Sequence, residues 1–137
     1  MKNLRSILAI LVVLLTAVAA HAQQTKVTAT VPFNFVAGDR TYPAGDYSFS
    51  NDGPVLQIAN TEQATSSNTM SQACESLRPS ADTKLVFQRM GGYYFLRQIW
   101  VAGHSRGREL PRSHTEVQLA QNHQKSGFVM LAANIAQ

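Results

Sequence analysis

Residues 84–103 have the sequence KLVFQRMGGYYFLRQIWVAG, and this stretch decides the fold. Two runs rich in aromatic and branched residues, 85–90 and 93–101, flank the pair Gly91-Gly92. A glycine pair can adopt the positive φ angles that a two-residue hairpin turn requires. The stretch therefore predicts a long antiparallel β-hairpin around which the remaining elements pack.

The predicted turn determines which residues lie opposite each other. The expected pairs are Met90 with Tyr93, Arg89 with Tyr94, Phe87 with Leu96, and Leu85 with Gln98. Directly opposed residues share a face of the sheet. The predicted core face is formed by Leu85, Phe87, Tyr94, Leu96 and Trp100. Ile99 is expected on the opposite face, which mixes polar and apolar residues.

The N-terminal segment has the features of a secretory signal peptide. Lys2 and Arg5 precede an apolar run over residues 7–20, which leads into an Ala-His-Ala site that ends at Ala22. These features predict export with cleavage after Ala22. The alternative is a membrane anchor, but the run is shorter than the roughly 20 apolar residues that span a bilayer. We expect no stable membrane span after cleavage and a single β-rich domain over 23–137.

The charge and cysteine content narrow the classes of function. The chain has 12 Lys and Arg against 8 Asp and Glu, and loss of Lys2 and Arg5 with the signal peptide lowers the net charge from +4 to +2. Basic residues are spread along the chain, so no nucleic-acid partner is expected. Cys74 is the only cysteine, and stability must come from an apolar core. Cys74 is either a partly buried small residue or a site of intermolecular pairing.

Apolar and polar residues alternate in several other segments. Over 27–35 the alternation predicts one nine-residue strand with a buried face, placed so that Pro32 is unpaired. Further short strands are expected over 40–42, 46–50, 55–59 and 128–133, with a weakly specified strand over 63–70. Gly38-Asp39, 51–54 and 60–62 are predicted turns, and 73–83 is a predicted connection.

Ser113 and Glu116 have the spacing of a capping box. In this motif the Ser oxygen accepts the amide of the third helical residue, and the Glu carboxylate reaches back to the amide of the cap. The motif predicts a helix over about 113–125, with Lys125 in its last turn and Gly127 just past its end. Together, the predicted strands and helix indicate a mainly β fold: an antiparallel β-sandwich or flattened barrel of about seven strands with one helix.

Three segments carry a resemblance. VPFNFVAGDRTYPAGDYSF, the central hairpin and GRELPRSHTEVQLA together resemble a group of uncharacterised small secreted bacterial proteins that are abundant in acidobacterial genomes. The similarity spans most of the chain after the signal peptide. It implies a shared β-rich fold and transfers no activity, because that group has no assigned catalytic or binding residues.

Motifs for catalysis and metal binding do not emerge. His104, His114, His123 and Cys74 match neither a Cys-x-x-Cys nor a His-Glu-x-x-His pattern. No nucleophile elbow is predicted: Gly103-His104-Ser105-Arg106-Gly107 has the Gly-x-Ser-x-Gly spacing, but it is not at a strand-to-helix turn. Several acidic residues fall in or near predicted turns, where Asp is favoured for local hydrogen bonding. No catalytic residue, metal site or cofactor is predicted.

Two groups of residues are candidates for ligand contact. His104, Arg106, Arg108 and Arg112 precede the predicted helix N-terminus and could bind a carboxylate, sulfate or phosphate; alternatively they are solvated or pair with Glu109 and Glu116. Tyr93 and Trp100 could contact a sugar ring or an apolar ligand, or they pack within the hairpin.

The sequence therefore predicts a non-enzymatic, secreted or periplasmic β-domain that binds a protein or glycan partner at the cell envelope or has a structural role there. The first alternative is a carrier or sensor of a small apolar or anionic ligand. The second is a hydrolase with an unrecognised site.

Overall fold

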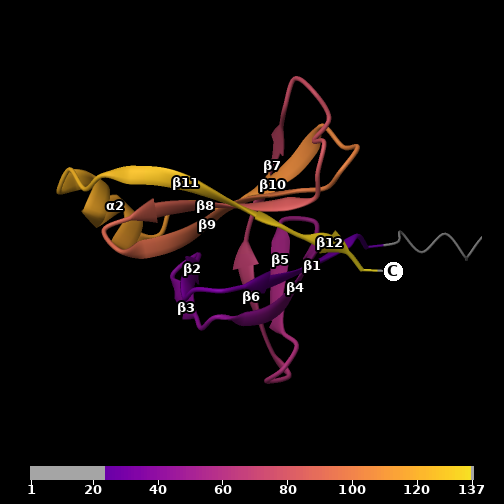
Figure 1. Cartoon of the computed structure of the whole chain (residues 1–137), viewed down its shortest axis with the longest axis horizontal. Coiled ribbons are helices and arrows are strands. Elements are labelled where there is room, and N and C mark those ends of the chain that lie inside the picture. The colour runs from indigo at the N-terminus through magenta and orange to yellow at the C-terminus, as the bar shows by residue number, and fades with distance from the viewer. Residues whose placement is uncertain (1–23, 137) are drawn as a thin grey trace, which may run out of the picture.

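The computed structural model of the chain describes residues 24–136. The predicted signal peptide, 1–22, and its cleavage site after Ala22 lie outside the described residues. The described part is a sandwich of two β-sheets with one helix (Figure 1). The strands are β1 (Lys26–Val31), β2 (Phe35–Ala37), β3 (Arg40–Tyr42), β4 (Gly45–Asp52), β5 (Val55–Asn60), β6 (Thr65–Met70), β7 (Gln72–Glu75), β8 (Lys84–Met90), β9 (Tyr93–Trp100), β10 (Arg106–Glu109), β11 (Ser126–Ala132) and β12 (Asn134–Ile135), and the helix is α2 (His114–Gln121).

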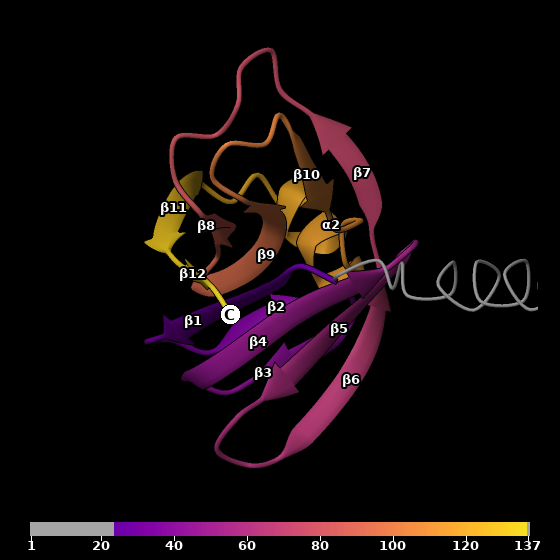
Figure 2. The same ribbon diagram turned by 90° about the vertical axis from the view of Figure 1, so that its right-hand side faces the viewer.

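The two sheets are open and face each other (Figure 2). The first sheet has the strand order β12-β1-β4-β5-β6. The second has the order β11-β8-β9-β10-β7, and the β2–β3 hairpin joins it through one parallel contact between β2 and β9. The predicted sandwich is confirmed, and the two open sheets distinguish it from the flattened barrel.

The first sheet forms where the sequence alternates most strictly. Tyr47 and Phe49 of β4 and Leu56 and Ile58 of β5 are each 1% exposed and point into the core. The expected nine-residue strand over 27–35 is wrong in its length, because β1 ends at Val31 before the proline. The chain then crosses to the second sheet and resumes there as β2.

The central hairpin is confirmed, with Gly91 and Gly92 at φ angles of 58° and 82°. Its register matches the prediction from Met90 opposite Tyr93 to Phe87 opposite Leu96. A β-bulge then shifts the pairing, because Val86 lies opposite Gln98 and Arg97 is the extra residue.

The bulge reverses the predicted positions of the last residues of β9. Leu85 pairs with Ile99 rather than Gln98, and Ile99 lies in the core. Trp100 therefore lies on the outer face of the second sheet and not on the core face. A bulge turns every later side chain of its strand to the opposite face.

Two strands of the second sheet were not predicted. β10 forms just before the predicted helix, where no strand was expected, and β7 overlaps the start of the predicted connection 73–83. The two strands pair with each other, from Arg106 opposite Glu75 to Glu109 opposite Gln72. These and other short segments raise the number of described strands to twelve, above the expected seven or so.

The helix begins as predicted but is shorter. The Ser113 side chain accepts a hydrogen bond from the amide of Glu116 at 3.1 Å. The expected return contact is wrong: the Glu116 carboxylate, 1% exposed, instead faces Arg97 at 3.5 Å and Arg112 at 3.9 Å. The helix ends at Gln121, so Lys125 lies beyond it and Gly127 belongs to β11.

The helix covers one end of the outer face of the second sheet, where β8 and β9 turn (Figure 1). Leu119 and Ala120 pack there against Val36, Met90 and Phe95. Beyond the helix this outer face carries a groove, which Phe128 and Met130 of β11 help to line and where they are 69% and 66% exposed.

Gly107 provides a test of this packing. A Cβ atom at position 107 would lie 2.7 Å from Cε3 of Trp100 and 2.8 Å from the carbonyl oxygen of Ile99. We expect Gly107→Ala to lower the free energy of unfolding by about 1–3 kcal/mol through overpacking. Gly127→Ala is the matched control, because nothing lies within 4 Å of its Cβ position. The measurement is urea unfolding, and equal stabilities of the two variants would contradict the close approach.

Candidate functional site

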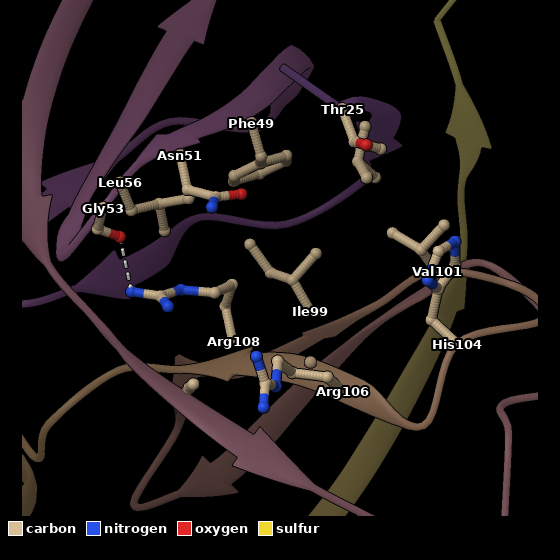
Figure 3. A pocket seen from close by; sticks show the side chains of 13 residues that line it. Thr25, Phe49, Asn51, Gly53, Leu56, Ile99, Val101, His104, Arg106 and Arg108 are labelled. Carbon is tan, nitrogen blue, oxygen red and sulfur yellow. Dashed lines mark hydrogen bonds between the residues drawn. The ribbon is translucent and has the colours of Figure 1, made fainter. Parts of the chain in front are cut away.

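A pocket of about 440 Å³ lies between the two sheets (Figure 3). The first sheet contributes residues of β1, β4 and β5 and the turn between β4 and β5, and the second contributes residues of β7, β9 and β10 and the segment that joins β9 to β10. Its lining residues are Thr25, Val27, Phe49, Asn51, Gly53, Leu56, Ala73, Ile99, Val101, His104, Arg106, Gly107 and Arg108. Three of the four predicted anion-binding residues are among them.

The inner part of the pocket is apolar. Val27, Phe49 and Leu56 come from the first sheet, and Ile99 and Val101 come from the second. All except Val101 are core residues that are at most 5% exposed. These four side chains are almost closed to solvent and form the floor of the pocket, whereas Val101 remains partly exposed there.

The basic residues at the pocket are oriented by the alternation of β10. Side chains alternate between the two faces of a strand. Arg106 and Arg108 therefore lie on one face of the sheet, and position 107, between them, lies on the opposite face. The Cβ position of Gly107 faces Trp100 on the outer side of the sheet. Arg106 and Arg108 consequently project from the inner side, where both line the pocket (Figure 3).

Arg108 closes one side of the pocket by linking the sheets. Its Nη2 donates to the carbonyl oxygens of Gly53 at 2.9 Å and Ser71 at 2.8 Å, and its Nε donates to the Ser71 hydroxyl at 3.2 Å. Figure 3 shows the guanidinium reaching Gly53 in the turn between β4 and β5. Nη1 makes no hydrogen bond within residues 24–136, so this donor is available at the pocket.

Arg106 and His104 have looser surroundings. Arg106 Nη2 lies 3.0 Å from the Glu75 carboxylate, and both side chains are 71% exposed. Such an exposed ion pair contributes about 0–1 kcal/mol and exchanges readily. His104 lies beside Val101, on the other side of the pocket from the Arg108 guanidinium (Figure 3).

The structure separates the remaining candidates from this pocket. Arg112 and Trp100 line a groove of about 590 Å³ on the outer face of the second sheet, together with Lys84, Arg97 and other residues. Tyr93 is 47% exposed at the opposite end of β9 from Trp100 and stacks on Phe95 with ring centroids 5.9 Å apart. The predicted four-residue basic cluster is thus divided between the two faces of one sheet.

Sequence reasoning missed the apolar wall of the pocket as part of a site. Val27, Phe49 and Leu56 alternate with polar residues as ordinary core residues do, and nothing in that pattern shows that the sandwich is open beside them. A signal for the basic residues did exist. In Arg106-Gly107-Arg108 the spacing of two places both arginines on one face once the segment is recognised as a strand.

Asp39 and His114 lie outside the pocket lining and contact each other. Asp39 accepts a hydrogen bond from the backbone amide of His114 at 3.0 Å, and this bond and the His114 ring hold the pKa of the Asp39 carboxyl below its usual value. Within residues 24–136 no three His, Cys, Asp or Glu side chains gather as metal ligands would. No helix in this part of the chain is long and apolar enough to cross a membrane.

Comparison of the chain with protein-family models, curated proteins and solved structures finds no match. The resemblance to the secreted acidobacterial group therefore stays a prediction.

The two pocket arginines should differ in their contribution to stability. Arg108→Ala removes hydrogen bonds from a charged donor to Gly53 and Ser71, so we expect a loss of about 1–3 kcal/mol in the free energy of unfolding. Arg106→Ala removes an exposed ion pair and should cost less than about 1 kcal/mol. Urea unfolding of both variants measures the difference, and a larger loss for Arg106→Ala would contradict these assignments.

Cys74 offers a test of local burial. Burial, and secondarily the negative charge of Glu109, raises the pKa of the Cys74 thiol above its ordinary value. Since the thiolate is the reactive form, we expect iodoacetamide at neutral pH to alkylate the folded protein more slowly than the urea-unfolded chain. Glu109→Gln should accelerate the reaction of the folded protein, whereas Glu62→Gln, at an exposed position, should not. Equal rates in folded and unfolded protein would exclude the proposed shift.

Proposed function

We propose that this protein is an exported, non-enzymatic binding domain of the cell envelope that holds a small amphipathic anion in the pocket between its sheets. The observation that carries the proposal is the juxtaposition of an apolar wall from both sheets with two arginines and a histidine. The predicted signal peptide supports export. The ligand class is an organic acid, sulfate or phosphate with an attached apolar group.

The size and lining of the pocket suit this class. A volume of about 440 Å³ falls within the roughly 300–1,000 Å³ typical of small-molecule sites. Burial of each methylene group contributes about 0.8 kcal/mol, so an apolar group that packs over Val101 and the apolar floor of the pocket adds to the affinity of the charged contacts. The uncharged part of the ligand is therefore expected to be apolar, like the residues that it contacts.

The charges suit an anion. None of the thirteen lining residues is acidic. Arg106 can exchange its exposed partner Glu75 for a ligand oxygen, and Arg108 has Nη1 available. The ligand's charged group would therefore sit near β10, with its apolar part directed between the sheets.

The same residues suit binding better than acid–base chemistry. The ionisable side chains that line the pocket are His104, Arg106 and Arg108. Arginine stays protonated in proteins and does not exchange protons with a substrate, and the lining residues include no carboxylate that could orient His104 as a general base. The arrangement thus supports the retention of a charged ligand, which favours a carrier or sensor over a hydrolase.

Two related dyes test the proposal. 1-Anilinonaphthalene-8-sulfonate and N-phenyl-1-naphthylamine share their rings, and only the first carries a sulfonate. We expect the folded protein to bind the sulfonate dye more tightly in fluorescence titrations. Arg106→Ala should weaken the sulfonate dye about threefold to tenfold, which corresponds to the loss of one charged contact, and leave the neutral dye unchanged.

Two further variants serve as controls. Ala73→Trp, at an exposed lining position, should obstruct the pocket and weaken both dyes. Arg40→Ala, at an exposed position on β3 away from the pocket, should weaken neither. Binding that is insensitive to Ala73→Trp, or equally sensitive to Arg40→Ala and Arg106→Ala, would overturn the proposal.

A further inference from the structure

Strand β11 forms one edge of the second sheet and pairs only with β8 within the described part of the chain. Figure 2 shows β11 as the outermost strand on its side of the sandwich. An edge strand presents a row of backbone donors and acceptors to any chain that can align with it. The free side of β11 is therefore a surface on which another strand can pair.

The sequence of β11 lacks the usual protection of such an edge. Its seven residues, SGFVMLA, contain no charged residue and no proline, and its pairing with β8 is regular from Ser126 to Ala132. Natural proteins generally block exposed edges with charges, prolines or bulges. β11 instead exposes Phe128 and Met130, a combination that favours pairing.

We propose that β11 is a homodimerisation edge, on which the occupant is β11 of a second copy in antiparallel orientation. The absence of charge supports a second copy, because a strand that carries one sign of charge would repel its own copy. The strand is also centred on Val129. A two-fold axis at this residue pairs all seven positions: Ser126 with Ala132, Gly127 with Leu131, Phe128 with Met130, and Val129 with Val129.

The exposed side chains match across this axis. Phe128 and Met130 lie on the outer face of the sheet, where both line the outer groove. Directly opposed residues share a face, so each Phe128 ring would lie beside Met130 of the other copy in a sulfur–aromatic contact. Val129 and Leu131, which pack against the core of their own copy, would lie on the inner face and meet Val129 and Gly127 of the other copy.

Pairing would join the two second sheets into one continuous sheet. Because both copies present the same face on the same side of that sheet, their outer grooves become neighbours across the axis. The inter-sheet pocket lies against β7, β9 and β10 rather than β11, so dimerisation leaves the proposed ligand site open. The two proposals can therefore fail independently.

Replacement of Phe128 and Met130 by charged residues tests the proposal. The probe is sedimentation velocity on the protein purified after export, over concentrations from 1 to several hundred micromolar. Two seven-residue strands form an interface below the roughly 1,200 Å² of standard complexes, so we expect a dimer with a micromolar dissociation constant. Phe128→Lys/Met130→Lys and Phe128→Glu/Met130→Glu should each weaken self-association at least tenfold, because the register places like charges opposite each other.

Mixing the two charged variants is the decisive step, because the same register then places every Lys opposite a Glu. The mixture should form a one-to-one dimer. Met70→Lys/Leu77→Lys, which changes two exposed apolar residues outside β11, should dimerise like the wild type. Near-UV circular dichroism verifies that each variant is folded. A wild type that stays monomeric, a mixture that stays monomeric, or loss of the dimer in the control variant would each overturn the proposal.

Discussion

The β-bulge at Arg97 is the constraint on which the arrangement of the second sheet depends. The bulge turns Ile99 into the core and Trp100 to the outer face. It also aims the Arg97 side chain at the end of β10, where Nη1 donates to the carbonyl oxygen of Leu110 at 3.0 Å and the Leu110 amide donates back to the Arg97 carbonyl at 2.9 Å. Leu110, fully buried, is thereby held in the core. The position of β10, and with it that of the pocket arginines, follows from this pair.

Gly107 makes the two faces of β10 interdependent. The Trp100 indole occupies the space that a side chain at position 107 would need, and Trp100 is on that face because of the bulge. The neighbouring residues, Arg106 and Arg108, must then point inward. The four-residue strand β10 thus separates the inner pocket from the outer groove, which lie on opposite faces of the second sheet. A substitution at position 107 consequently affects both surfaces.

The parts of the fold that could be predicted are those in which local pattern and tertiary packing agree. The Gly91-Gly92 turn and the alternation around Tyr47 and Phe49 each specify their own geometry. β7 and β10 could not be predicted, because QACE and RGRE have no apolar alternation and become strands only by pairing with each other. The bulge could not be predicted either, because the residue types at Gln98, Ile99 and Trp100 are compatible with either face of the sheet. The division of the basic cluster between two faces follows from these same long-range contacts, which is why the sequence identified the residues but not their grouping.

The buried carboxylate of Glu116 explains why the helix keeps its position over one end of the second sheet. Both of its oxygens are inaccessible to water and accept no hydrogen bond within the described residues, so their main stabilisation is the charge of Arg97 at 3.5 Å and Arg112 at 3.9 Å. A buried ion pair of this kind adds little net stability, because desolvation offsets the attraction. Any displacement of the helix would, however, leave a buried charge without its partners, which is strongly unfavourable. The pair therefore acts on geometry: it aligns the first turn of α2 with the bulge, and through the bulge with β10 and the pocket.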